Sequence, residues 1–136
     1  MNLYSIAHWN YHNAIMMMKY NNTSEFDRDF KRLKKRFRTL SEDLGTVKRS
    51  AIELCHIHGL CHNLEEISGV GNSKDLKFYK VKKFASLSIP GKGSKTGLRL
   101  IYAFFPQLDE IIFLEIYFKG DKENEDKKRI KEFIKA

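Results

Sequence analysis

The sequence predicts a single α+β domain with an N-terminal strand, a helical hairpin packed on a twisted antiparallel sheet, and a short C-terminal helix. Two changes of pattern predict it. Apolar residues recur at helical spacing between residues 24 and 58, and then alternate with polar residues from residue 76 onward. Residues 15–20 are strand-like, whereas residues 1–14 show no clear period. We therefore expect an N-terminal extension over 1–14 and one domain over 15–136.

Two helices are predicted from their start and stop signals. Thr23 and Ser24 are N-cap candidates for the first helix. Thr39 with Glu42 fits a capping box for the second helix, and Gly59 is a candidate C-cap. Both helices have an apolar stripe, so we expect them to pack side by side on the sheet. The stripe of the first helix consists of Phe26, Phe30, Leu33 and Phe37.

Three strands follow in the second half of the chain. Alternation predicts a strand over 76–84, and apolar-rich runs predict strands over 98–105 and 111–119, with a glycine-containing basic loop between the first two. Residues 106–109 form a turn that makes the last two strands a hairpin at the centre of the sheet. A charged helix over 123–135 ends the chain.

The composition excludes several classes of protein. No apolar run is long enough to cross a membrane, and no secretory signal is recognisable at the start, so we expect a cytoplasmic protein. Two cysteines are too few for disulfides to hold a fold together. This number is typical of a protein in a reducing compartment. The net charge of +8 suits a polyanionic partner such as nucleic acid, the ribosome or an acidic protein.

The positive charge is concentrated in residues 74–99. This stretch has eight cations and Asp75 as its single carboxylate, which leaves +7. Cations that converge on one sheet surface repel each other unless an anion joins them, so the stretch predicts a phosphate-binding surface. A lysine-protected edge strand is the structural alternative. The cations are Lys74, Lys77, Lys80, Lys82, Lys83, Lys92, Lys95 and Arg99.

Four segments together resemble the RelE family of the RelE/ParE toxin superfamily. They are SEFDRDFKRLKKRFRTLSEDL, FYKVKKF, GKGSKTGLRLIYAFFP and FLEIYFKGDKENEDKKRIKEF, in the expected order. The resemblance implies a RelE-like compact fold and cleavage of mRNA in the ribosomal A site, hence an endoribonuclease that inhibits translation. It also implies a cognate antitoxin that covers the basic surface. We expect no metal and no other cofactor.

The resemblance also implies the site residues. Lys80 and Lys82 match the paired lysines of the active strand, Arg99 matches the arginine that follows the glycine, and Lys122 falls near the second arginine of the family. We assign Lys80 or Lys82 as base candidate, Arg99 as stabiliser of the phosphorane, and Lys122 or Lys119 as phosphate contact or acid. Further expected RNA contacts are Lys83, Lys92, Lys95, Tyr117 and Lys119.

The chain departs from the family in its closing helix. RelE has a tyrosine there that stacks on the RNA base, whereas residues 127–129 read Lys-Lys-Arg. Tyr117 and Lys119 are the candidate substitutes. Two alternative functions follow: a ParE-type toxin that inhibits DNA gyrase, and a catalytically inactive RNA- or protein-binding member of the same fold. The ParE group lacks the basic constellation, so the lysines and Arg99 favour the RelE type.

Two further sets of residues have alternative interpretations. Glu115 is either a second candidate base or a carboxylate paired with a neighbouring lysine. Five residues between 55 and 62 have zinc-binding side chains, but their spacing crosses the predicted helix end, which favours a helix-to-loop junction over a metal site. These five are Cys55, His56, His58, Cys61 and His62.

Overall fold

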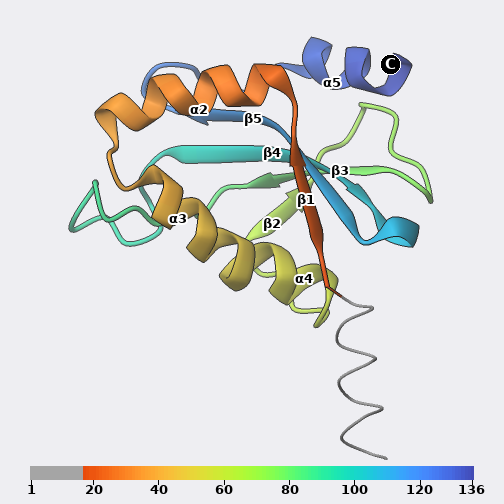
Figure 1. Ribbon diagram of the computed structural model, residues 1–136, viewed down its shortest axis with the longest axis horizontal. Coiled ribbons are helices and arrows are strands. Elements are labelled where there is room, and N and C mark those ends of the chain that lie inside the picture. Colours follow the sequence, from red (N-terminus) through yellow and green to blue (C-terminus); the bar gives the residue numbers. More distant parts are fainter. Residues whose placement is uncertain (1–16) are drawn as a thin grey trace, which may run out of the picture.

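The structure is a computed structural model that describes residues 17–136. The chain forms a five-stranded sheet in the order β1-β5-β4-β3-β2, with helices on both faces (Figure 1). The strands are β1 (Lys19–Asn22), β2 (Leu64–Glu66), β3 (Lys77–Val81), β4 (Leu98–Phe105) and β5 (Glu110–Phe118); the helices are α2 (Ser24–Arg36), α3 (Leu40–Val47), α4 (Leu54–His56) and α5 (Lys127–Lys135).

The α+β prediction is confirmed, with two differences in the sheet. The first strand pairs with β5 in parallel, so the sheet is mixed rather than wholly antiparallel. The long connection from β1 to β5, which includes the helices and β2 to β4, allows the parallel pairing that no tight turn can make. A short edge strand, β2, also pairs with β3 and was not predicted. The predicted N-terminal extension, residues 1–14, lies outside the described residues.

The helical hairpin begins and ends for local reasons. Thr23 caps α2 as predicted, because its side-chain oxygen accepts a hydrogen bond from the backbone N–H of Phe26. The predicted capping box is wrong: Thr39 makes no side-chain cap and instead donates to Asp43 at 2.8 Å. A π-helical turn, Lys48–Glu53, joins α3 to α4.

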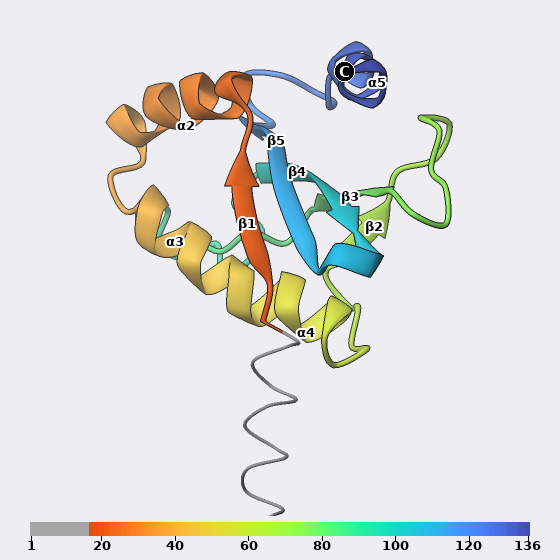
Figure 2. The same ribbon diagram turned by 45° about the vertical axis from the view of Figure 1, so that its right-hand side comes forward.

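Two apolar clusters hold the three layers together. The larger one lies between α2, α3 and the sheet, where Phe26, Leu40 and Ile52 pack against inward-facing strand residues. The smaller one lies on the opposite face, where Ile130 of α5 packs near Phe78. Figure 2 shows α2 and α3 on one side of the sheet and α5 on the other. Within residues 17–136, no helix has the length and apolarity that a membrane crossing needs.

Candidate functional site

Arg99 and Lys82 lie together where β3 ends and β4 begins. The last pair of the β3–β4 ladder is Val81 with Leu100, so the next step of the antiparallel register places Lys82 opposite Arg99. Nη1 of Arg99 donates to the backbone oxygen of Lys82 at 2.9 Å. The alternation of the strand places Lys80 on the same sheet face, the one that α5 covers.

Lys80 is held by a carboxylate from the segment before α5. Its Nζ lies 2.6 Å from Oε2 of Glu125, and the two side chains are only 13% and 7% exposed. Burial tends to raise the pKa of Glu125, but the hydrogen bond and charge of Lys80 lower it below its ordinary value. Lys80 is therefore a largely covered cation whose charge is balanced by Glu125 in this conformation.

Lys82 is also paired, but at the surface. Its Nζ contacts the carboxylate of Glu65 in β2, and both side chains are about half exposed, at 53% and 51%. An exposed pair of this kind contributes only ~0.2–1 kcal/mol and exchanges readily with other ions. A phosphate can therefore replace Glu65 at Lys82 far more easily than it can replace Glu125 at Lys80.

Lys122 belongs to a third pair, with Glu115 of β5. The Glu115 side chain is 3% exposed and accepts from Lys122 Nζ and from the backbone N–H of Asp126 at 2.9 Å. Lys122 remains 40% exposed. Of the two interpretations of Glu115, the carboxylate paired with a lysine is the one observed, and it is buried rather than at the surface.

Tyr117 does not have the exposed ring that a base-stacking residue needs. It is buried at 6% exposure, and the Lys122 ammonium lies 5.4 Å from its ring centroid. Burial, followed by the charges of Glu125 and Glu115, raises the pKa of its hydroxyl. The covered ring leaves no open face for an RNA base in this conformation.

The remaining expected contacts are exposed lysines in the segments that adjoin β3, β4 and β5 along the chain. Lys119 follows β5, and its backbone N–H donates to Gly97 just before β4. Residues 82–98 include four lysines and no carboxylate. We call this set the cationic end of the sheet, comprising Lys82, Lys83, Lys92, Lys95, Arg99 and Lys119.

A polar cleft of about 320 Å³ adjoins this end between α2, β5 and α5. Asp29 and Arg129, joined by a 2.6 Å ion pair, line it together with Tyr117, Glu115 and Lys122. Sequence reasoning missed Asp29, Arg129 and Glu125. Each lies far along the chain from its partner, so only the three-dimensional arrangement reveals the pairs.

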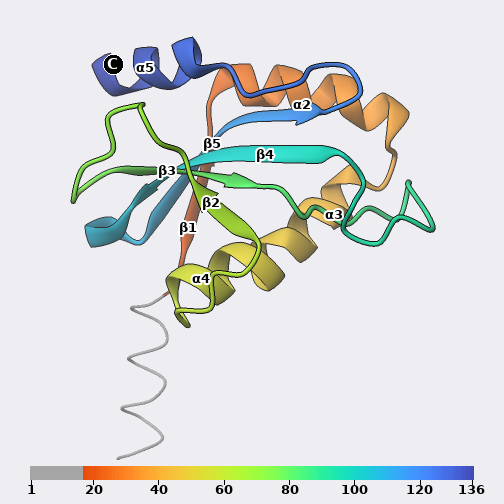
Figure 3. The same ribbon diagram turned by 180° about the vertical axis from the view of Figure 1, so that it is seen from behind.

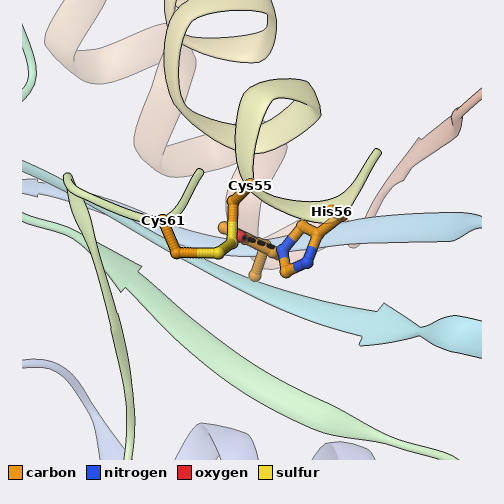
Figure 4. Close-up of a disulfide and its surroundings, with 4 residues drawn as sticks. Cys55, His56 and Cys61 are labelled. Atoms are coloured by element: carbon orange, nitrogen blue, oxygen red, sulfur yellow. Dashed lines mark hydrogen bonds between the residues drawn. A yellow bond between two sulfur atoms is a disulfide. The ribbon is translucent and has the colours of Figure 1, made fainter. Parts of the chain in front are cut away.

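Cys55 and Cys61 form a disulfide, which corrects the expectation of reduced cysteines (Figure 4). Gly59 adopts φ 75°, and its N–H donates to the Cys55 carbonyl, so the chain reverses and returns Cys61 to the helix end. The sulfurs are not thiolate ligands in this form. Within residues 17–136, no group of three or more His, Cys, Asp or Glu side chains is arranged to hold a metal ion.

His56 points from α4 onto the sheet rather than toward a metal. Its Nε2 lies 2.6 Å from the hydroxyl of Tyr102, and its ring stacks on Phe104 at 4.0 Å between centroids. Burial and the nearby charge of Lys77 lower the pKa of His56 to about 4. His56 is therefore a neutral packing residue at ordinary pH.

The site and fold define an α+β protein with a concentrated cationic sheet end. Similar solved structures include archaeal RelE, from the RelE–RelB complex of Pyrococcus horikoshii, at 13% identity over 76% of this chain and 96% of that one, with a TM-score of 0.46. A conserved hypothetical protein from Helicobacter pylori is 18% identical over 77% and 98% of the two chains, with a TM-score of 0.42. These similarities concern the arrangement of the chain. No protein-family model and no curated protein matches the sequence.

Proposed function

We propose that this chain is a RelE-type toxin that cleaves mRNA at the ribosome and is neutralised by a cognate antitoxin. The observation that carries the proposal is the contact of Arg99 with Lys82 at the cationic end. The Arg99 guanidinium is held at the Lys82 backbone, and adjoining segments carry the exposed Lys83, Lys92, Lys95 and Lys119, a set of cations that suits the phosphates of a single RNA strand.

Arg99 is the proposed stabiliser of the transition state. Cleavage by the 2′-hydroxyl of the RNA itself produces a phosphorane whose added negative charge must be met by fixed donors. Within residues 17–136, Nη1 of Arg99 donates hydrogen bonds to the backbone carbonyls of Lys82 and Leu98. Those two bonds orient the guanidinium while Nη2 and Nε remain for phosphate oxygens.

The proton transfers are assigned by exposure. Lys82 is the proposed base, because its partner Glu65 is easily displaced while Lys80 is held by Glu125. Lys122 is the proposed acid for the 5′-oxygen, since its ammonium reaches the surface beside the Glu115 carboxylate. In this assignment Lys80 does not contact RNA. It holds Glu125, and with it the segment before α5, against the strand.

Expression of the chain alone tests the proposal. Induction should arrest growth and protein synthesis, and primer extension on translated mRNA should show new 5′ ends that disappear when translation is blocked. Co-expression with the neighbouring gene of its operon should restore growth. A DNA-damage response with translation intact would instead support the ParE-type alternative.

A second candidate is an RNA-binding member of the fold without nuclease chemistry. The pairing of Lys80 with Glu125 and of Lys122 with Glu115 favours it, because both lysines already have carboxylate partners. This candidate predicts translation arrest and ribosome association with no new 5′ ends. The same primer-extension experiment therefore separates the two.

A further inference from the structure

The disulfide ties a helix end to the lead-in of an edge strand. Cys55 lies in α4 and is buried at 6% exposure, whereas Cys61 is exposed and lies three residues before β2 begins at Leu64. Figure 3 shows β2 at the margin of the sheet, reached directly from α4. The bond therefore fixes the point from which β2 starts.

β2 also supplies the carboxylate that neutralises Lys82. It has three residues and, within the part of the chain that the structure describes, pairs with β3 alone, with Glu65 opposite Lys80 in the register. Its far end is anchored, because Ile67 is buried and its N–H donates to the Phe78 carbonyl. The near end, which holds Leu64 and Glu65, has the disulfide as its covalent tether. So short an edge strand gains little stability from its own ladder.

We propose that the Cys55–Cys61 disulfide is a reversible thiol–disulfide site that regulates RNA binding through Glu65. This inference rests on the proposed function, in which Lys82 engages RNA phosphate. With the bond closed, β2 holds Glu65 against Lys82. With the bond open, the near end of β2 frays, Glu65 leaves, and Lys82 accepts a phosphate in its place.

The reductant is a dithiol, and the exchange balances. A thiolate of the dithiol attacks Sγ of the exposed Cys61, the S–S bond breaks, and Cys55 leaves as a thiolate that takes up a proton. The second thiolate of the dithiol then attacks the mixed disulfide and releases Cys61. The chain gains two electrons and two protons, and the dithiol becomes a disulfide. Disulfides of proteins that work in a reducing compartment are usually of this transient, redox-sensing kind.

The test measures the affinity of the full chain for a fluorescein-labelled single-stranded RNA oligonucleotide by fluorescence anisotropy. The protein is compared in its disulfide form and after treatment with dithiothreitol. Loss of one exposed ion pair should make the reduced form bind about two- to five-fold tighter. One added phosphate contact should steepen the dependence of log Kd on log salt by about 0.7. Cys55→Ser/Cys61→Ser should behave like the reduced form.

Two single-charge variants identify the residue responsible. Glu65→Gln should bind as tightly in the disulfide form as the reduced parent does, and dithiothreitol should change it no further. Glu66→Gln is the matched control, because it removes the same charge from the neighbouring position of β2, which pairs with Tyr79 and does not contact Lys82. It should keep the redox response. Amide hydrogen exchange should accelerate at residues 64–66 on reduction.

The outcomes separate this inference from the proposed function. Equal affinity and equal salt dependence of the two redox forms would overturn the regulation while leaving RNA binding intact. An identical effect of Glu66→Gln and Glu65→Gln would overturn the role of the Lys82 contact. Absence of RNA binding by every form, Glu65→Gln included, would overturn the proposed RNA-binding function and this inference with it.

Discussion

Glu125 reaches across from the segment before α5 to bind Lys80 of β3, with 2.6 Å between Oε2 and Nζ. The Lys80 and Glu125 side chains are only 13% and 7% exposed, so water has little access to either. A buried ion that loses its partner is costly, because the low-dielectric surroundings do not replace the lost interaction.

Glu125→Ala should therefore reduce the free energy of unfolding by about 3 kcal/mol, since it leaves the Lys80 ammonium buried and alone. Urea denaturation of the full chain measures the loss. Lys80→Met combined with Glu125→Leu removes both charges and should recover stability to within about 1 kcal/mol of the parent. If the double variant is as unstable as Glu125→Ala, packing rather than charge explains the loss.

The exposed pair of Lys82 and Glu65 provides the internal comparison for that experiment. Both side chains are about half in water, so Glu65→Ala should cost less than about 1 kcal/mol. The contrast between the two pairs, measured under one set of conditions, tests whether burial decides which lysine is available to RNA. Similar losses for the two pairs would contradict that assignment.

Arg99→Ala should abolish growth inhibition without unfolding the chain. Loss of a preorganised donor to the transition state typically costs ~3 kcal/mol, or a rate decrease of about a hundredfold. Arg99 is partly exposed and its two hydrogen bonds go to backbone carbonyls at its own sheet end. The thermal midpoint should therefore change little.

Arg28→Ala is the matched control for Arg99, because Arg28 is a 71% exposed arginine near the start of α2, where the Thr23 N–H donates to Phe113 rather than to the strand ends beside Arg99. It should retain toxicity. Arg99→Lys keeps the charge but loses the planar fork, so it should be intermediate. A fully toxic Arg99→Ala chain would contradict the assignment of Arg99.

His56 should make the stability of the chain depend on mildly acidic pH. Its folded-state pKa is lowered from 6.5 to about 4, so between these values the unfolded chain binds a proton that the folded chain does not. The neutral His56 ring makes its full contribution to the free energy of unfolding above about pH 6.5, and this contribution is lost as the pH falls toward 4. Thermal midpoints measured across this range should decline.

His56→Gln tests the source of that decline, because glutamine does not titrate but can still hydrogen-bond the hydroxyl of Tyr102. The variant should show a flatter profile between about pH 6.5 and 4. His58→Gln is the control, since His58 is exposed and should leave the slope unchanged. An unaltered slope in His56→Gln would show that another group titrates.

Local pattern was sufficient for the long elements of the fold. The strand over 98–105 was predicted with the same bounds as β4, because it is an apolar-rich run of strand-forming residues that Pro106 ends. The cap at Thr23 was predicted for the same kind of reason. β2 was missed, since two of its three residues are glutamates and only its pairing with β3 makes it a strand.

The cations of the candidate site could be predicted from the sequence, but their partners could not. The count over 74–99 gave an excess of +7, yet Glu125 and Glu65 lie outside that stretch and neutralise two of its lysines. Such pairs form by tertiary contacts between distant segments, and a local sequence pattern does not indicate them. The disulfide departs from the prediction because the turn at Gly59 brings Cys61 back to Cys55, which the number of cysteines does not indicate.

Asp43 is the residue that fastens the basic loop between β3 and β4 to α3. It is buried at 3% exposure and accepts from the hydroxyls of Thr39 and Ser86 at 2.8 and 2.6 Å and from the N–H of Leu87 at 3.1 Å. Asp43→Ala should reduce the free energy of unfolding by about 2–3 kcal/mol, because one buried and two partly buried donors lose their acceptor. Urea denaturation measures the loss.

Glu42→Ala distinguishes this anchor from the capping box that the sequence predicts. Glu42 is exposed and adjacent to Asp43 in α3, so its removal should change stability by less than about 0.5 kcal/mol. If the capping box formed instead, Glu42→Ala would be the costly change and Asp43→Ala the mild one. Amide exchange at residues 86–89 should increase in Asp43→Ala alone, because only that variant releases the loop from the helix.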